Sequence, residues 1–327
     1  MRTPSRARAC GALAAGLALA AGGLAVAGVC GCEPAQPGAT GRPATVPTAG
    51  LRAPTGREEI CCCGIGQLFI VNVAEARRDP SRRVWTWKPA DSPRIAERHR
   101  SKWDVRLEGK PVMGGKAVLV CASYRGAVAL VRRSDKACLF YAGGHGGHSA
   151  DLIGDDLVAY ALSTSRHELR LYRRPKDGPV NPKPAWTMPL TGGHAVVWDG
   201  ARGVLWALGS AELLKLRVDR KAPSAEVLKR WKLPGAGGND LILLDAEHLA
   251  VSTKEGVHRF HVASGTFSPM PRLAKTGPVK GMSLHPATGQ LVYTVGDGQF
   301  TDTVRFLGGG AIVFKGLKLY KARWVVP

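Results

Sequence analysis

Acidic side chains are scarce in this sequence. Its 327 residues include 25 Asp and Glu but 46 Lys and Arg, which gives a formal net charge of +21. Such an excess predicts attraction to anionic partners, such as an acidic polymer or an envelope surface. The basic residues are dispersed, and no nucleic-acid-binding motif accompanies them, so sequence-specific nucleic-acid binding is not expected. Dispersed cations also keep a protein soluble, and that alternative stays open.

The common catalytic signatures are also missing. The sequence has no nucleophile elbow, no HExxH, no phosphate-binding glycine loop and no carboxylate spacing that identifies a hydrolase. No window keeps an amphipathic 3.6-residue period for long, which argues against a helical fold. These absences favour a non-catalytic role over an enzyme, without excluding the enzyme.

What the sequence does contain is a five-residue pattern that returns about every 45 residues. It occurs at 103–107, 148–152, 194–198, 239–243 and 280–284, and one further step back reaches Glu59. Short apolar runs punctuated by Gly, Asp and Pro follow each occurrence, as at 116–123, 156–163, 203–209, 248–253 and 290–295. Four short strands per unit of this length are typical of a propeller blade. Six starts therefore predict an all-β, six-bladed propeller of four-stranded blades, with the tail 308–324 closing the ring against the first blade.

The N-terminal region has a different composition. Three arginines precede an uncharged Ala/Leu/Gly run, which predicts a secretory signal over 1–32 and hence an exported protein of the periplasm, cell envelope or exterior. Cys32 ends a stretch that resembles a lipoprotein cleavage box and would carry the lipid; ordinary cleavage after Ala27 is the alternative. Residues 33–57 are rich in Pro, Ala and Gly and are expected to form a flexible linker. The propeller then occupies 58–327, as a monomer.

Five cysteines fall in the predicted propeller: Cys61, Cys62, Cys63, Cys121 and Cys138. The last two are expected on the second and fourth strands of one blade, roughly 9–10 Å apart, which is beyond the reach of a disulfide. The triplet alternates between the two faces of a strand and lacks the second ligand pair of a zinc site. All five are expected to be buried, free thiols.

The candidate binding site follows from the repeat. If the pattern falls on the innermost strand of each blade, its first two positions line the central channel, where propellers bind ligands. These positions are mostly polar: Trp103, Asp104, His148, Ser149, His194, Asn239, Asp240 and Lys280. We expect a small polar molecule or a carbohydrate there. The alternative is that these side chains only connect neighbouring blades.

A metal site is the second functional hypothesis. Glu59, Asp104, Asn239 and Asp240 have oxygen ligands that suit calcium. His148 and His194 have nitrogen ligands that suit a transition metal. One divalent ion in the channel would make the protein a metal-assisted hydrolase or lyase.

Several segments together resemble a known family: 146–152 (GGHSADL), 192–209, 237–253, 279–293 and the ending 319–324 (LYKARW). The resemblance is to exported bacterial propellers that are catalogued only as a domain of unknown function. It covers nearly all of 58–327 and implies six blades, but no activity. Members of that family tend to have a histidine at the position of Asn239 and an acidic residue near Cys63, so the metal hypothesis fits this chain less well.

Overall fold

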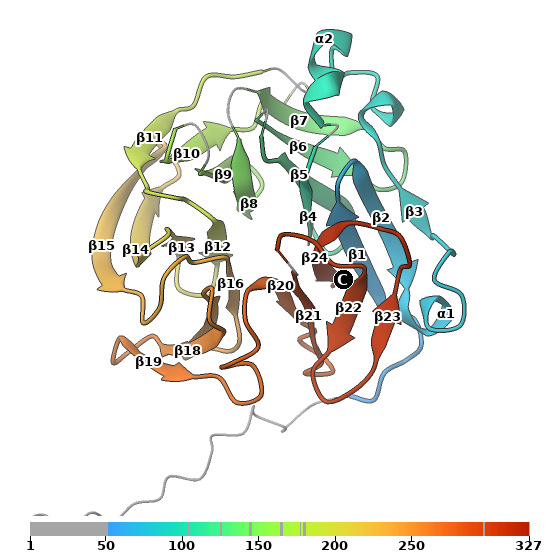
Figure 1. The fold of residues 1–327 in the computed structure, drawn as a ribbon. Coiled ribbons are helices and arrows are strands. Elements are labelled where there is room, and N and C mark those ends of the chain that lie inside the picture. The colour runs from blue at the N-terminus through green and yellow to red at the C-terminus, as the bar shows by residue number, and fades with distance from the viewer. Residues whose placement is uncertain are drawn as a thin grey trace, which may run out of the picture. The chain divides into compact units, whose positions relative to one another are not determined.

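A computed structural model describes residues 52–326, apart from 104, 125, 144–145, 164–165, 177, 179–180 and 297. The described residues form six four-stranded antiparallel sheets, which are arranged as blades around a central axis (Figure 1). The predicted six-bladed, all-β propeller is therefore confirmed. The predicted signal segment and the linker up to residue 51 lie outside the described residues.

Each blade is named here from its innermost to its outermost strand. Blade 1 contains β24 (Leu319–Val325), β1 (Glu59–Gly64), β2 (Gln67–Asn72) and β3 (Trp85–Thr86). Blade 2 contains β4 (Leu107–Val112), β5 (Ala117–Ala122), β6 (Ala127–Arg132) and β7 (Cys138–Gly143). Blade 3 contains β8 (Gly147–Ile153), β9 (Leu157–Leu162), β10 (Glu168–Arg173) and β11 (Trp186–Pro189).

The remaining three blades have the same order. Blade 4 contains β12 (Ala195–Asp199), β13 (Val204–Leu208), β14 (Glu212–Asp219) and β15 (Ser224–Lys232). Blade 5 contains β16 (Asp240–Leu243), β17 (His248–Ser252), β18 (Val257–His261) and β19 (Thr266–Pro269). Blade 6 contains β20 (Val279–Leu284), β21 (Leu291–Val295), β22 (Thr303–Phe306) and β23 (Ala311–Val313).

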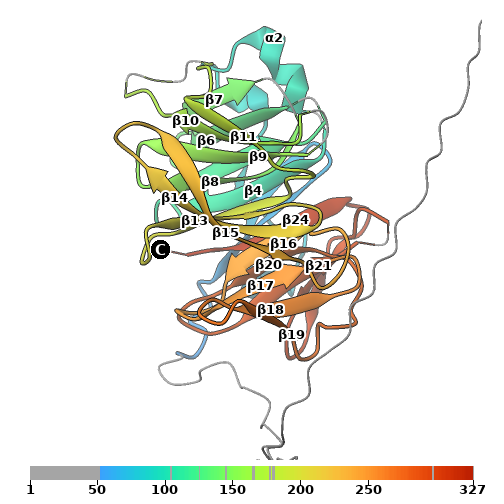
Figure 2. The same cartoon turned by 90° about the vertical axis from the view of Figure 1, so that its left-hand side faces the viewer.

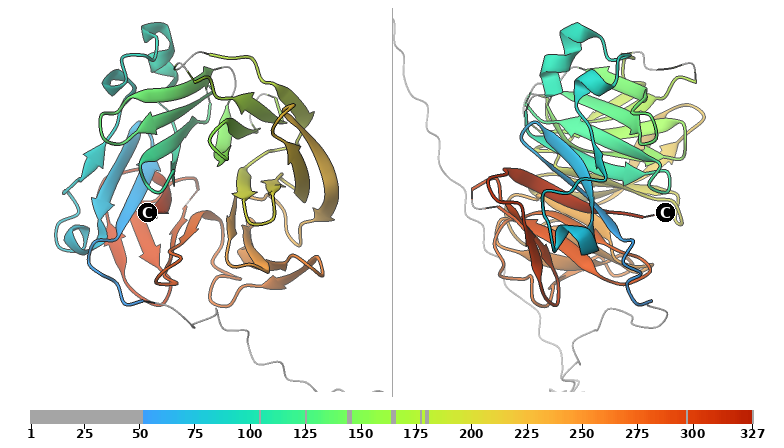
Figure 3. Two further views of the ribbon diagram at one scale, coloured as in Figure 1. Left: turned by 180° about the vertical axis from the view of Figure 1, so that it is seen from behind. Right: turned by 90° about the vertical axis from the view of Figure 1, so that its right-hand side faces the viewer.

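The C-terminal strand closes the ring. Strand β24 pairs antiparallel with β1, with Glu59 opposite Val325 and Cys62 opposite Ala322, and it becomes the innermost strand of blade 1 (Figure 3). The predicted closure by the tail is confirmed. The expectation that Glu59 lines the channel was wrong, because β24 stands between β1 and the channel. Glu59 instead forms an ion pair with Arg133 at 2.9 Å.

The core is divided among the interfaces between blades. Six clusters of buried apolar side chains each join two neighbouring blades, so both faces of every blade are apolar. Cys61 and Cys63 pack toward blade 2, whereas Cys62 packs toward blade 6, as strand alternation requires. All five described cysteines are buried and free. Cys121 lies on β5 and Cys138 on β7, the second and fourth strands of blade 2, as predicted.

Glycine pairs form two of the turns that lead into an innermost strand. Gly192 and Gly237 have positive φ angles of 57° and 65°, which favour glycine. The second glycine of the later pair, Gly238, lies so close to the preceding blade that a Cβ would stand 2.5 Å from the carbonyl oxygen of Gly209. The polar residue that follows each pair, His194 or Asn239, is thereby set at the end of the channel.

Helical structure is limited to short turns: α1 (Val73–Ala76), η1 (Pro89–Asp91), α2 (Glu97–Arg100) and η2 (Ser101–Trp103). Three of them lie in the connection between blades 1 and 2, at the edge of the ring (Figure 2). Within the described ranges, no helix is long and apolar enough to cross a membrane.

Candidate functional site

One end of the channel is surrounded by a polar side chain from each blade. These six residues stand at the start of the innermost strands or directly before them, and we call them the mouth ring: Arg106, His148, His194, Asn239, Lys280 and Tyr320. Their equivalence follows from the backbone, because the carbonyl of Arg106 accepts from Ser123 N, and His194 N and Asn239 N donate to the carbonyls of Leu208 and Ser252. Six different blades thus supply one site.

Arg106 and His148 are directly connected. Nη2 of Arg106 lies 2.9 Å from Nε2 of His148. Because a guanidinium only donates, Nε2 accepts, and the neutral ring carries its proton on Nδ1. That Nδ1–H group is buried and has no hydrogen-bond partner among the described residues. An unpaired buried donor costs about 1–3 kcal/mol, so this position favours an incoming acceptor.

His194 has the complementary tautomer. Its Nδ1 lies 2.6 Å from the carbonyl oxygen of Gly192 and donates to it, which leaves the lone pair of the neutral ring on Nε2. The ring packs edge to face against His148, with centroids 4.5 Å apart. The two histidines therefore share the channel, as the repeat predicted.

Both histidines are held neutral. Burial lowers the pKa of His148 well below its ordinary 6.5, and the nearby His194 and Arg106 lower it further. The pKa of His194 falls to about 4, mainly through burial and against the hydrogen bond to Gly192. Desolvation disfavours the charged imidazole, and the surrounding cations act in the same direction.

The two cations of the mouth ring have no acidic partner. Arg106 bonds to Ser123 Oγ, Gln299 Oε1 and His148, and Nζ of Lys280 lies 3.3 Å from Asn239 Oδ1. Neither forms an ion pair with any described carboxylate. Burial lowers the pKa of Lys280, and so does the charge of Arg106. Among the described residues, the positive charge of the mouth ring is therefore uncompensated.

Aromatic rings accompany the cation at this end of the channel. The guanidinium of Arg106 lies 4.7 Å from the ring centroid of Tyr320 and 5.5 Å from that of Tyr124. Phe300 packs edge to face against Tyr320, at 6.5 Å between centroids. Tyr124 is 61% exposed, so a flat apolar face is open to solvent beside the polar ring.

A buried ion cluster fills the channel behind the mouth ring. Lys321 and Arg323 of β24 bind Glu108 of β4 and Asp240 of β16, with N–O distances between 2.7 and 3.2 Å. All four side chains are almost fully buried. Burial alone would raise the pKa of Asp240, but the charges of Arg323 and Lys321 outweigh it and hold that pKa below 3.8. The cluster has two charges of each sign, so it closes the channel without adding net charge.

The opposite end of the channel is largely apolar. It holds a cavity of about 210 Å³, with lining residues that include Val197, Leu241, Ile242 and Trp324. Its one described ion pair joins Lys110 to Asp151 at 3.3 Å. A few convergent polar groups orient a ligand in a protein site, and the mouth ring gathers them from six blades, so it is the candidate functional site.

The predicted site residues separate into three groups. His148, His194, Asn239 and Lys280 come together in the mouth ring. Ser149 and Asp240 lie one position further along their strands and connect neighbouring blades: the Ser149 hydroxyl accepts from Val196 N, and Asp240 accepts from Met282 N at 2.7 Å.

The remaining two predicted residues lie elsewhere. Trp103 is in the core, 1% exposed and edge to face with Trp87, so its predicted place in the channel was wrong. Asp104 lies outside the described residues.

Sequence analysis missed Arg106 and Tyr320. The sequence nevertheless contained an indication of each residue's position. The tail was expected to close the ring, so its residues Tyr320, Lys321 and Arg323 were candidates for positions next to the channel. Arg106 stands 42 residues before His148, whereas a step of 45 selects Trp103. The irregular connection that contains η1, α2 and η2 accounts for the difference.

Among the described residues, those predicted to hold a metal in the channel do not form a group of three ligands. Glu59 is at the periphery, both oxygens of Asp240 bind the ion cluster, and Nε2 of His148 accepts from Arg106. In the part of the chain that the structure describes, the one group of three potential metal ligands is Glu247, His248 and His261. These residues belong to blade 5 and are not on its innermost strand.

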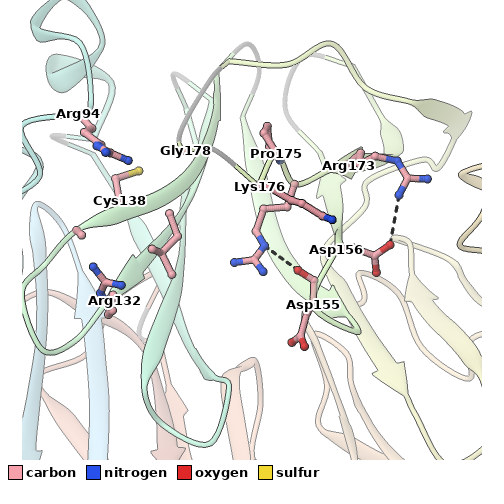
Figure 4. A pocket seen from close by; sticks show the side chains of 12 residues that line it. Arg94, Arg132, Cys138, Asp155, Asp156, Arg173, Pro175, Lys176 and Gly178 are labelled. Atoms are coloured by element: carbon pink, nitrogen blue, oxygen red, sulfur yellow. Dashed lines mark hydrogen bonds and ion pairs between the residues drawn. The ribbon is translucent and has the colours of Figure 1, made fainter.

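A larger groove of about 1060 Å³ lies between blades 2 and 3, away from the channel (Figure 4). Five basic residues line it: Arg94, Arg132, Arg173, Arg174 and Lys176. The two acidic residues of the groove are Asp155 and Asp156. Asp156 binds Arg173 at 3.3 Å, and the Asp155 carbonyl accepts from Arg174 (Figure 4). None of the predicted site residues contributes to this groove.

Comparisons with known proteins agree with the fold. The sequence model of a family described as "Family of unknown function (DUF6528)" matches residues 69–327. No curated protein matches the chain. Among solved structures, a functionally unknown protein from Desulfotomaculum acetoxidans DSM 771 superposes with a TM-score of 0.55 at 10% identity, covering 83% of this chain and 99% of that one. A protein of unknown function from Bacteroides caccae gives 0.55 at 11%, covering 82% and 98%. At such identities the likeness shows the fold alone.

Proposed function

The chain belongs to DUF6528, a family of unknown function, and we propose that it is a non-catalytic binding propeller whose mouth ring takes a small polar ligand that carries an anionic group. A sugar acid is the class that fits best. The observation that carries this proposal is the pair of cations, Arg106 and Lys280, which share one end of the channel without a carboxylate partner among the described residues.

The anionic group of the ligand would replace the missing counter-charge. A guanidinium binds a carboxylate through two parallel hydrogen bonds, which are stronger than neutral ones. Burial of a cation without a partner has a free-energy cost, and an anion that binds in the mouth offsets that cost. His148 supports the same choice, because its unpaired Nδ1–H group requires an acceptor. His194, neutral with a lone pair on Nε2, would accept from a ligand hydroxyl.

The aromatic rings suggest the rest of the ligand. Tyr124, Tyr320 and Phe300 place apolar faces beside Arg106. A pyranose ring has apolar C–H faces and polar edges, so it matches a site in which flat apolar surface adjoins a few oriented polar groups. A sugar that also carries a carboxylate uses both features.

The proposal includes the cellular location. The basic and apolar segments within residues 1–32 support export, and Cys32 supports attachment through a lipid. A propeller outside the cytoplasm would meet saccharides of the envelope or the surroundings. The groove between blades 2 and 3, where five basic side chains face two acidic ones, is the surface that best fits the anionic polymer expected from the net charge.

Calorimetric titration of the full chain tests the proposal. The probes are D-glucuronate, D-glucose and inorganic sulfate. We expect glucuronate to bind at least tenfold more tightly than either, because only it offers both a carboxylate and a sugar ring. Arg106→Gln should remove that preference, whereas Arg217→Gln, at an exposed ion pair of blade 4, should leave it unchanged. Equal affinity for glucose and glucuronate would refute the anionic class, and no binding of any probe would refute the sugar acid.

A further inference from the structure

Two histidines face each other across neighbouring strands of blade 5. His248 begins β17 and His261 ends β18, and the register pairs them directly (Figure 2 shows both strands). Their ring centroids are 5.1 Å apart. Directly opposed residues of an antiparallel pair have Cβ atoms about 4.5–5.5 Å apart, so both imidazoles can reach one point from a rigid base.

A carboxylate completes this group. Glu247 precedes His248, and one ligand atom from each of Glu247, His248 and His261 lies within 4.8 Å of the others. We propose that these three side chains bind a divalent transition-metal ion of the zinc class. Imidazole nitrogen and carboxylate oxygen are donors that such ions prefer, whereas calcium prefers an all-oxygen set.

The geometry needs only small side-chain movements. Ligands that stand about 2.0–2.2 Å from a tetrahedral zinc ion lie about 3.3–3.5 Å from one another. Glu247 is exposed and His248 and His261 are half-buried, so the carboxylate is free to close the remaining distance. Strand pairing fixes the backbone of both histidines, so the entropy cost of ordering falls mainly on the Glu247 side chain.

Partners outside the three ligands hold both rings. Asp245 Oδ1 and Arg259 Nη2 lie 2.8 Å and 3.0 Å from Nδ1 of His248, so this nitrogen can donate to the carboxylate or accept from the guanidinium. When it donates to Asp245, Nε2 is left for the metal. Ser264 N donates to Nδ1 of His261 at 3.2 Å, and Ser264 Oγ lies 2.8 Å from the same atom. Metal binding through Nε2 would move the ring proton to Nδ1, where Ser264 Oγ can accept it in place of the bond from Ser264 N. A carboxylate behind a ligating histidine is a common feature of protein zinc sites.

The local charge also suits a cation. Glu247 and Asp245 contribute two negative charges, and Arg259 contributes one positive charge, with Nη2 3.5 Å from Asp245 and 3.0 Å from Nδ1 of His248. The balance is one negative charge in a protein that is otherwise strongly basic. This differs from the mouth ring, where the uncompensated charge is positive.

Calorimetric titration of the chelator-treated full chain with Zn²⁺, and separately with Ca²⁺, tests the inference. We expect one zinc equivalent that His261→Ala weakens at least tenfold and that Ca²⁺ does not reproduce. Asp245→Asn should also weaken zinc binding about tenfold or more through His248. His258→Ala, on the same strand but on its other face, is the matched control and should bind zinc normally.

Two further variants locate the ion if the result differs. Loss of zinc in His148→Ala/His194→Ala, with retention in His261→Ala, would place the metal in the channel and overturn the inference. Zinc that is retained in both, and lost when Cys30 and Cys32 become Ser, would assign it to the N-terminal cysteines and overturn it equally. None of these outcomes decides whether the mouth ring binds a sugar acid, which glucuronate titration measures separately.

Discussion

The imidazole rings of His148 and His194, from two different blades, meet edge to face at 4.5 Å with their planes 72° apart. One neutral ring has a free N–H donor and the other has a free lone pair, so the pair can hydrogen-bond to a donor and an acceptor on the same ligand. Arg106 on one side and Lys280 on the other add positive charge.

Replacing both histidines by alanine should abolish ligand binding and leave the fold nearly intact. Neither ring belongs to the six apolar clusters between the blades, so their loss removes little of the hydrophobic core. We expect affinity for glucuronate to fall at least tenfold and the melting temperature to change by no more than a few degrees. Calorimetry and thermal unfolding measure the two effects. A large drop in melting temperature would instead identify the histidines as structural.

Stability should decline as the solution is acidified from pH 6.5 toward pH 4. The pKa of His194 falls from 6.5 to about 4 on folding, and burial also holds the pKa of His148 well below 6.5. In this window the unfolded chain binds more protons than the folded protein does. The free energy of unfolding therefore keeps its full value above pH 6.5 and decreases as the pH falls.

Denaturant titrations at pH 7 and pH 5 measure this decline. The variant His148→Gln/His194→Gln should lose less stability between the two pH values than the wild type, because two of the titrating groups have been removed. Part of the loss should remain, because His99, His258 and His285 also have lowered pKa values and are present in both proteins. Equal losses in both proteins would show that the mouth histidines do not contribute.

Lys321→Met should strongly destabilise the propeller. Among the described residues, Glu108 and Asp240 would then share Arg323 as their one remaining cationic partner. Removal of one member of a buried ionic group costs about 3–5 kcal/mol in the free energy of unfolding. Arg217→Met, at an exposed pair with Glu226, is the control and should have little effect. Urea titration measures the free energy of unfolding of both variants. Similar small losses in the two variants would contradict the prediction.

The five propeller cysteines should resist alkylation in the native protein. Burial raises the pKa of the Cys63 and Cys138 thiols to about 12, and the thiolate is the reactive species. Iodoacetamide at neutral pH should therefore modify none of Cys61, Cys62, Cys63, Cys121 and Cys138 until guanidinium unfolds the chain. Peptide mass spectrometry reads each position. Native labelling of Cys138, which packs between blades 1 and 2, would show that its interface opens.

The fold is predictable from the sequence because each blade repeats the same physical requirement. Both faces of a blade are buried against its neighbours, so runs such as 116–123 and 156–163 are apolar throughout and became β5 and β9. The turns between blades require positive φ angles, which explains the glycines at 192 and 237. Both features show in the local sequence, although the burial itself joins different blades.

The site is only partly predictable, because its contacts join distant residues. Lys321 binds Glu108 across 213 positions and Asp240 across 81. No local pattern reveals that these charges neutralise one another. The repeat placed His148 and His194 at equivalent positions of neighbouring blades, as in the structure, because their connections have regular lengths. It misplaced the mouth position of blade 2, because the helical turns before β4 change the spacing.

The pairing of β1 with β24 has a consequence for the order in which the protein is made. Residues 59–64 leave the ribosome early, but their partner strand, 319–325, follows only after blades 2 to 6 have been synthesised. Until then the first blade has three strands and presents an open edge that other chains can join. Blades 2 to 6 have no such delay, since all four strands of each are consecutive. Completion of the ring therefore waits until residues 319–325 are available, and a chain that stops before residue 319 leaves β1 without this partner strand.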